Sequence, residues 1–239
     1  MTTLHHHETG AESVSVLAHE GTYPILYGSY EIPVGSGHAP GYLARPDQAG
    51  RFPAVLVLPW TGLTSHHKDV CRRLARHGLA TVALGLEVAG GDAVVFVDET
   101  YEFLMSSEVT WAIQHQLGIV GLGAGGGPGL IYATDHPEIG AVALVSTPLD
   151  QDGPVANALS RLSAPVLGLY GADDESLRGP SVDDGRIPHG SFVVYQGVAG
   201  GFLDDGAAEY DAAAAADAYR RLIEFFAQAL PAPQIERLG

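Results

Sequence analysis

Cysteine is almost absent from this chain of 239 residues, which contains only Cys71. A single cysteine cannot close a disulfide within the chain. Residues 69–75, which surround it, read as part of a helix. We therefore interpret Cys71 as a small apolar helix residue rather than as a nucleophile.

Basic side chains are also scarce. The chain has 12 Lys and Arg but 28 Asp and Glu, which gives a formal net charge of −16. Such a charge repels nucleic-acid phosphates and anionic lipids, so we expect neither a nucleic-acid nor a membrane partner. No apolar run is long enough to cross a bilayer, and the first residues lack a signal-peptide pattern, which predicts a cytoplasmic protein. The sequence does not indicate an oligomeric state.

The organisation of the chain predicts one domain of the larger sort, since 46% of the residues are hydrophobic and only 17% are charged. We expect residues 1–15, which include His5, His6 and His7, to be a disordered leader rather than a metal site. Residues 16–239 should form a single domain. We see neither an internal repeat nor an interdomain linker.

Short apolar runs alternate with segments of helical pattern, which predicts a doubly wound, mostly parallel sheet flanked by helices. The continuous run 54–58 has the character of a strand buried on both faces. The predicted strands are residues 42–44, 54–58, 80–84, 117–121, 141–145, 166–170 and 192–195. The predicted helices are 68–77, 100–116, 128–134, 155–162 and 207–230, and 179–190 reads as an exposed loop.

Residues that directly follow the strands are the informative ones, because ligands of open parallel sheets bind beyond the carboxyl ends of the strands. After the run 117–121, the segment 121–126 allows two interpretations. Gly121, Gly123 and Gly126 fit the G-x-G-x-x-G pattern of a dinucleotide loop, but that pattern normally opens the first βαβ unit, with an acidic residue about 20 positions on. Here the turn follows at least three strands, and Asp150 is the next candidate.

The competing interpretation is the nucleophile elbow G-x-S-x-G, which the spacing of Gly121, Gly123 and Gly125 matches. A carboxylate after a later strand, Asp174, and a glycine-rich loop at 197–201 follow in the order that this fold uses for its acid and its histidine. This order favours the elbow, although the nucleophile and histidine side chains are missing.

The chain resembles the dienelactone hydrolase family over about residues 41–230. The resemblance is carried by residues 41–46, 52–57, 62–75, 118–126, 165–174 and 210–218. It implies an α/β-hydrolase fold. In the family pattern, Cys or Ser stands at the position of Gly123, His at that of Gly200 and a Glu that helps control the nucleophile at that of Pro59. Asp174 matches the triad acid, while the family's substrate-binding arginine has no counterpart near Glu87.

A glycine offers neither hydroxyl nor imidazole, so we expect no triad hydrolysis. Backbone N–H groups of Ala124 and Trp60 would still form an oxyanion hole. We expect a largely apolar pocket in which Trp60, Leu122, Val88 and Phe202 contact a hydrophobic small molecule. The predicted substrate-binding residues are Trp60, Thr61, Gly123, Ala124, Ser146, Gly200 and Phe202.

Our hypothesis from these residues is a non-hydrolytic cyclase, isomerase or lyase that acts on a carbonyl-bearing metabolite, with Asp174 or Glu87 as acid or base. A silent binding protein and a hydrolase that uses direct attack by water stay open as alternatives. His66 and His67 are assigned a packing role. No cofactor is expected, and no metal site, because the histidines beyond the leader show no ligand pattern.

Overall fold

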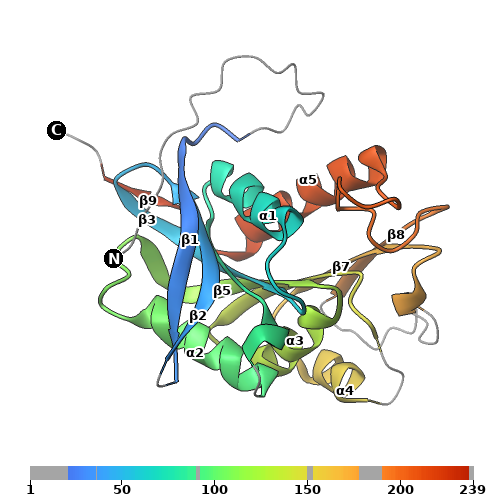
Figure 1. The fold of residues 1–239 in the computed structure, drawn as a ribbon, viewed down its shortest axis with the longest axis horizontal. Coiled ribbons are helices and arrows are strands. Elements are labelled where there is room, and N and C mark those ends of the chain that lie inside the picture. The colour runs from blue at the N-terminus through green and yellow to red at the C-terminus, as the bar shows by residue number, and fades with distance from the viewer. Residues whose placement is uncertain (1–20, 36, 90–91, 150–152, 178–189, 237–239) are drawn as a thin grey trace.

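The computed structural model describes residues 21–35, 37–89, 92–149, 153–177 and 190–236 (Figure 1). The expected leader at 1–15 lies outside these ranges, as does most of the loop expected at 179–190. No helix within them combines the length and the apolar character needed to cross a membrane.

A single sheet organises the described residues, with nine strands in the order β1-β2-β4-β3-β5-β6-β7-β8 and β9 paired with β3. Strands β3 to β8 pair in parallel, whereas β1 and β2 form an antiparallel hairpin that joins the sheet at β4. The bounds are β1 Ile25–Val34, β2 Gly37–Pro46, β3 Gly50–Pro59, β4 Ala80–Leu84, β5 Ala112–Leu122, β6 Ile139–Val145, β7 Val166–Gly171, β8 Gly190–Tyr195 and β9 Gln234–Ile235.

Helices cover both faces of this sheet, which confirms the predicted α/β class. Two helices, α1 (Ser65–Arg76) and α5 (Ala212–Ala229), lie on one face, and α2 (Ala93–Met105), α3 (Gly126–Asp135) and α4 (Pro154–Arg161) lie on the other (Figure 1). Short 3₁₀ turns follow three strands, at Leu86–Ala89 (η1), Gly123–Gly125 (η2) and Glu175–Leu177 (η3).

Strand β3 shows how the sequence produces these layers. Successive side chains of a strand point to opposite faces. Leu56 and Leu58 accordingly pack in the core beneath α2, α3 and α4, while Val55 and Val57 pack in the core beneath α1 and α5. Because both faces are covered, the run is apolar throughout rather than alternating, as the sequence predicted.

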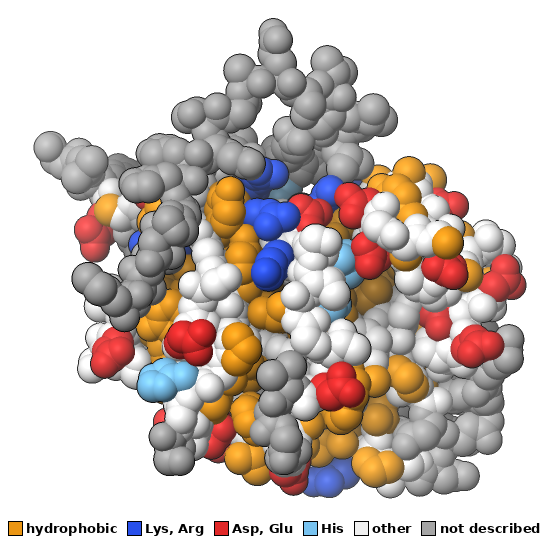
Figure 2. All heavy atoms as spheres, viewed as in Figure 1, with side chains coloured by type: hydrophobic (Ala, Val, Ile, Leu, Met, Phe, Trp, Pro, Cys, Tyr) orange, Lys and Arg blue, Asp and Glu red, His pale blue; other side chains and the backbone are white. Residues whose placement is uncertain are grey.

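The surface in Figure 2 carries acidic side chains spread over the face in view, while most of the basic ones gather near α1. On α1, Arg72 and Arg73 both bind Asp69, and the Arg73 guanidinium stacks 4.7 Å from the ring centre of Tyr219 on α5. Exposed ion pairs contribute little stability. Their packing against aromatic rings nevertheless fixes how α1 lies against α5, next to the site described below.

Two predictions about the elements were wrong. The helix expected at 100–116 ends at Met105, and β5 already begins at Ala112. The first strand, β1, was not predicted. Its side chains are mostly half-buried or exposed, so it lacks the continuous apolar run by which the central strands were recognised. The remaining predicted strands and helices lie within or overlap observed ones.

Gly118 on β5 lies directly under a ring of α5. A Cβ atom at Gly118 would lie 2.6 Å from Cε1 of Phe226, so the absence of a side chain lets the Phe226 ring lie on the strand. We expect Phe226→Ala to lower the free energy of unfolding by about 3–5 kcal/mol, since it opens a cavity between α5 and β5. Guanidinium denaturation measures the change. Phe225→Ala is the matched control, because that neighbouring ring is only partly buried, and equal losses in the two variants would contradict this packing.

Candidate active site

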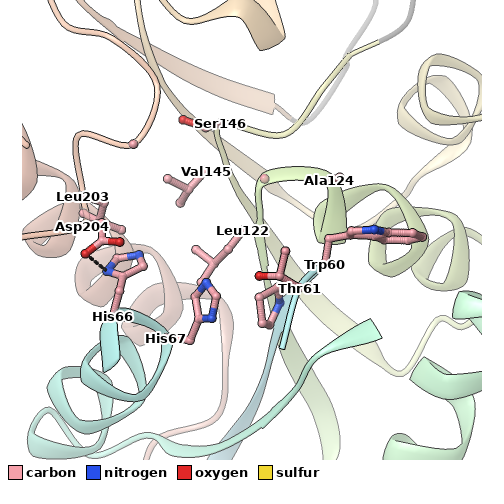
Figure 3. Close-up of a pocket in the computed structure, with 13 residues that line it drawn as sticks. Trp60, Thr61, His66, His67, Leu122, Ala124, Val145, Ser146, Leu203 and Asp204 are labelled. Carbon is pink, nitrogen blue, oxygen red and sulfur yellow. Dashed lines mark ion pairs between the residues drawn. The ribbon is translucent and has the colours of Figure 1, made fainter. Parts of the chain in front are cut away.

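A cavity of about 390 Å³ lies at the carboxyl ends of β3, β5 and β6, which we call the elbow cavity (Figure 3). This edge is where open parallel sheets bind their ligands. Side chains from the first turn of α1 and from the loop between β8 and α5 close its other sides. It is lined by Pro59, Trp60, Thr61, His66, His67, Leu122, Gly123, Ala124, Val145, Ser146, Gly201, Leu203 and Asp204.

The turn between β5 and α3 has the tight geometry of an elbow. Gly123 has φ +56°, a left-handed conformation that favours glycine, and a Cβ there would meet open space. A Cβ at Gly121 would collide with the backbone of Gly126, and one at Gly125 with the Leu58 carbonyl. Glycines at these two positions therefore let the strand turn sharply into the helix. The position that points into the cavity, residue 123, carries no side chain.

Asp174 lies directly behind Gly200. A Cβ atom at Gly200 would lie 2.9 Å from Asp174 Oδ1, so a side chain at position 200 would start next to this carboxylate. Oδ1 accepts a hydrogen bond from the Ser176 N–H at 2.8 Å, whereas Oδ2 is buried without a partner. The structure thus brings together the two positions that the family resemblance assigns to the acid and the histidine.

Five of the nine residues predicted for the site line the elbow cavity, namely Trp60, Thr61, Gly123, Ala124 and Ser146. The other four do not. Phe202 is fully buried in the core beneath α1 and α5, and Gly200 stands between Asp174 and the lining residue Gly201. The side chain of Glu87 is exposed. Its connection to the site is through the backbone, because its N–H donates a hydrogen bond to the Trp60 carbonyl at 2.7 Å. The side chain of Val88 lies outside the described residues.

Ser146 is strained, and its hydroxyl is buried. It follows β6 with φ +50°, a conformation that non-glycine residues rarely adopt, and its hydroxyl has no partner. Three further buried atoms without partners, Thr147 Oγ1, Asp174 Oδ2 and Ser176 Oγ, come from the same ends of β6 and β7. Buried polar groups normally have partners. This edge of the sheet therefore has unused hydrogen-bonding capacity, as a binding site does.

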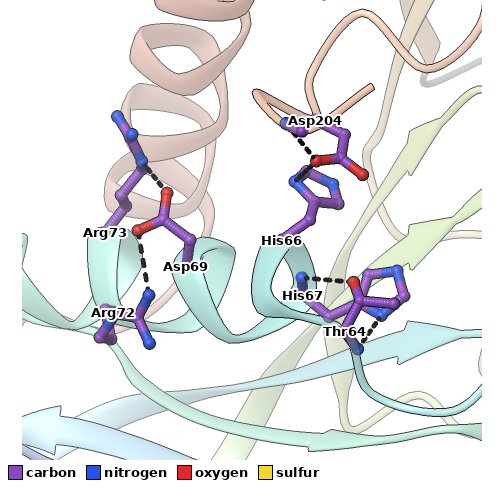
Figure 4. Close-up of polar contacts among 8 residues, drawn as sticks. Thr64, His66, His67, Asp69, Arg72, Arg73 and Asp204 are labelled. Carbon is purple, nitrogen blue, oxygen red and sulfur yellow. Dashed lines mark hydrogen bonds and ion pairs between the residues drawn. The ribbon is translucent and has the colours of Figure 1, made fainter. Parts of the chain in front are cut away.

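Sequence reasoning gave His66 and His67 a packing role, but both line the cavity, as does Asp204, which was not predicted for the site. Thr64 caps α1 and places both histidines in its first turn, on the wall of the cavity (Figures 3 and 4). Nδ1 of His66 lies 4.0 Å from Oδ1 of Asp204. The capping pattern of residues 64–67 was the local signal for these positions. The sequence held no signal that the loop carrying Asp204 folds over them.

Burial keeps both imidazoles uncharged at neutral pH. It lowers the pKa of His66 below its usual range, and the carboxylates of Asp204, Asp69 and Asp205 oppose that effect. The pKa of His67 falls to about 4, first through burial and then through the neighbouring His66. By contrast, burial raises the pKa of the Cys71 thiol to about 12, which fits its place in the core and not a nucleophile.

The described residues hold no group of three His, Cys, Asp or Glu side chains arranged for a metal ion. What they bring together is a largely apolar cavity with a backbone turn, two neutral imidazoles and a carboxylate. Such a set can polarise a carbonyl and move a proton.

Comparison with known proteins identifies relatives over most of the chain. The model of the dienelactone hydrolase family matches residues 39–88 and 97–230. A Yersinia pestis protein named as a carboxymethylenebutenolidase is 30% identical over 251 residues, covering 89% of this chain and 94% of that protein. A relative of the same name from Escherichia coli K12 is 30% identical, covering 85% and 88%.

Solved structures agree with this similarity. The crystal structure of a Klebsiella pneumoniae protein, named as a dienelactone hydrolase, is 27% identical and superimposes with a TM-score of 0.74. The similarity covers 85% of this chain and 99% of that one.

The low pKa of His67 makes the stability of the protein depend on pH. An unfolded histidine, with a pKa near 6.5, binds a proton between about pH 6.5 and pH 4, whereas the folded His67 does not. We therefore expect the free energy of unfolding to fall as the pH is lowered through this window. Guanidinium denaturation at pH 7, 6 and 5 measures the effect.

His67→Gln is the matched variant for this measurement. Glutamine can keep the hydrogen bond that Nδ1 accepts from the Thr64 N–H, but it does not titrate. It should flatten the pH dependence, and an unchanged dependence would contradict the assignment to His67.

Proposed function

The chain belongs to the dienelactone hydrolase family, a family of hydrolase enzymes, and we propose that this member moves protons on an apolar carbonyl compound without a covalent intermediate. Gly123 carries the proposal. The family resemblance puts the nucleophile there, and glycine has no atom that could attack a carbonyl. The reaction would be an isomerisation, a cyclisation or an elimination.

The elbow turn supports such chemistry through its backbone. Ala124 and Trp60 both line the elbow cavity, and their backbone N–H groups do not depend on the residue at position 123. Aimed at a substrate carbonyl, they would stabilise the negative charge that develops on oxygen when a neighbouring carbon loses its proton.

A second cavity supports a hydrophobic substrate. It has a volume of about 410 Å³, meets the elbow cavity at Ala124 and is lined mainly by apolar side chains, among them Ile131, Leu149 and Val155. A substrate whose carbonyl lies at the elbow turn could extend its apolar part between α3 and α4. Ligand sites of this kind are mostly apolar, with a few polar groups that fix orientation.

Hydrolysis by direct attack of water is the second candidate. The relatives are named for action on carboxymethylenebutenolide, whose ring also contains a carbonyl. The same oxyanion donors would serve it, and no acyl-enzyme would form. A protein that binds without turnover is the remaining alternative.

Two isotope-labelling assays distinguish proton transfer, hydrolysis and binding without turnover. We expect the protein to accelerate exchange of the α-protons of 2-tetralone, an apolar ketone, in D₂O, followed by proton NMR. Hydrolysis is assayed with 4-nitrophenyl butyrate in H₂¹⁸O, followed by mass spectrometry. Exchange no faster than in buffer, together with ¹⁸O entering the acid product faster than in buffer, would replace the proposal by hydrolysis. Neither reaction, with retained binding of 2-tetralone, would indicate a binding protein.

The acid or base role predicted for Asp174 and Glu87 does not follow from the lining of the cavity, so it stays a prediction. Asp174→Asn keeps an acceptor for the Ser176 N–H, and Glu87→Gln changes an exposed residue, so both variants should fold. Full exchange activity in both would reject the two assignments. The cytoplasmic location also stays a prediction.

Ala124→Pro tests the oxyanion donors, because proline lacks the N–H group but tolerates the first positions of a helix. We expect kcat for exchange to fall about 100-fold or more. Ala124→Ser is the matched control, since it alters the side chain and keeps the N–H. Circular dichroism checks that both variants fold, and an active Ala124→Pro variant would remove this part of the proposal.

A further inference from the structure

We propose that His66, positioned by Asp204, is the base that takes the proton from the substrate in the elbow cavity. This inference rests on the function proposed above. Neither residue stands at a position that the family resemblance assigns to the acid, the histidine or the nucleophile. His66 comes from the first turn of α1, and Asp204 comes from the loop between β8 and α5.

The Asp204 carboxylate is held in place by its own loop. Its Oδ1 accepts a hydrogen bond from the Gly206 N–H at 2.9 Å, and the Asp204 N–H donates to the Gly201 carbonyl at 3.0 Å (Figure 4). The same Oδ1 lies 4.0 Å from His66 Nδ1. This distance is longer than a hydrogen bond, as contacts in ligand-free active sites commonly are, and a small movement would close it.

Partial burial of His66 and Asp204 reduces the screening by solvent of the interaction between their charges. The His66 side chain is 11% exposed and that of Asp204 is 36% exposed. With Nδ1 directed at the carboxylate, the proton of a neutral imidazole belongs on Nδ1. The lone pair is then on Nε2, the other nitrogen of the ring. A carboxylate that orients an imidazole in this way also stabilises the imidazolium that forms when Nε2 accepts a proton.

His67 has the opposite arrangement. Its Nδ1 accepts the hydrogen bond from the Thr64 N–H at 3.2 Å, so the proton of its neutral ring is on Nε2. It can donate a hydrogen bond but cannot act as a base through that nitrogen. Of the two imidazoles that line the cavity, only that of His66 therefore offers a free lone pair.

The proposed step needs no reactant other than the substrate and His66. Nε2 of His66 takes a proton from the carbon next to the carbonyl. The electrons of the broken C–H bond form a C=C bond, and the electrons of the C=O π bond move to oxygen, where the N–H groups of Ala124 and Trp60 stabilise them. The imidazolium then returns a proton to the same carbon, which gives exchange, or to another carbon, which gives an isomer. No oxidant, reductant or co-reactant is needed.

The arrangement can be tested without turnover. In protein labelled with ¹⁵N-histidine at pH 7, we expect the ring nitrogens of His66 to show the Nδ1–H tautomer and those of His67 the Nε2–H tautomer. Asp204→Asn should lower the pKa of His66, because it removes a carboxylate that favours the charged ring. Asp69, Asp205, Arg73 and His67 also face this ring, and they are unchanged in the variant. An Nε2–H tautomer at His66, or an unchanged pKa, would overturn the proposal.

Kinetics provide the second test, with 2-tetralone in D₂O as the probe. His66→Gln should lower kcat for exchange about 100-fold or more. Asp204→Asn should lower it less and move the acidic limb of the pH profile to lower pH, a shift that a merely structural role would not produce. Asp205→Asn is the matched control, because it removes the same charge from the neighbouring exposed residue outside the lining, and it should shift the acidic limb less than Asp204→Asn does.

Two outcomes separate this inference from the function on which it rests. If Ala124→Pro loses exchange and His66→Gln keeps it, the proposed function stands and His66 is not the base. If the wild-type protein shows no exchange, the proposed function fails, and the tautomer measurement still decides whether His66 and Asp204 form a pair. Should His66→Gln not fold, His66→Ala with added imidazole replaces it, and failure of imidazole to restore any exchange would count against the proposal.

Discussion

The close packing of β5 and α3 around one glycine-rich turn is the constraint on which the site depends. Side chains at Gly121 and Gly125 would collide with the backbone of Gly126 and of β3, so both positions are closed to larger residues. Between them, Gly123 adopts φ +56° above open space. The turn consequently presents fixed backbone donors at the carboxyl edge of the sheet. Donors that are already in place need no reorganisation when charge develops, whatever residue stands at position 123.

The proton-transfer groups have to come from elements outside that turn. The first turn of α1 can supply them because Thr64 caps the helix beside the end of β3. The loop after β8 is tightened by the Asp204–Gly201 hydrogen bond and places Asp204 4.0 Å from His66 in that turn. Ion pairs and aromatic contacts on the other side of α1 hold it against α5. The position of His66 thus follows from packing between helices far apart in the sequence.

This dependence also explains how far the sequence could be interpreted. The central strands were predictable because burial on both faces leaves continuous apolar runs, as in β3. Strand β1 was not predictable in this way, because a hairpin at the edge of the sheet keeps polar side chains. The start of β5 was predicted as helix because Gln114, His115 and Gln116 are exposed and interrupt the apolar run. The elbow turn was predictable from its glycine spacing together with the later Asp174 and the loop at 197–201. The proximity of His66 to Asp204 was not, since it depends on where a loop folds.

Two carboxylates, Asp174 and Asp204, therefore compete for the role of the acid that supports a base, and their surroundings decide between them. Asp174 is buried behind Gly200, where no imidazole is attached, and its Oδ2 has no partner. Its Oδ1 is already engaged by the Ser176 N–H, and Asp174 does not line the elbow cavity, so it does not face a substrate there. Asp204 lines the cavity, keeps access to solvent and lies next to an imidazole. An imidazole that gains a proton is stabilised only where such a carboxylate stands, so physical chemistry favours the pair on α1 and the β8–α5 loop.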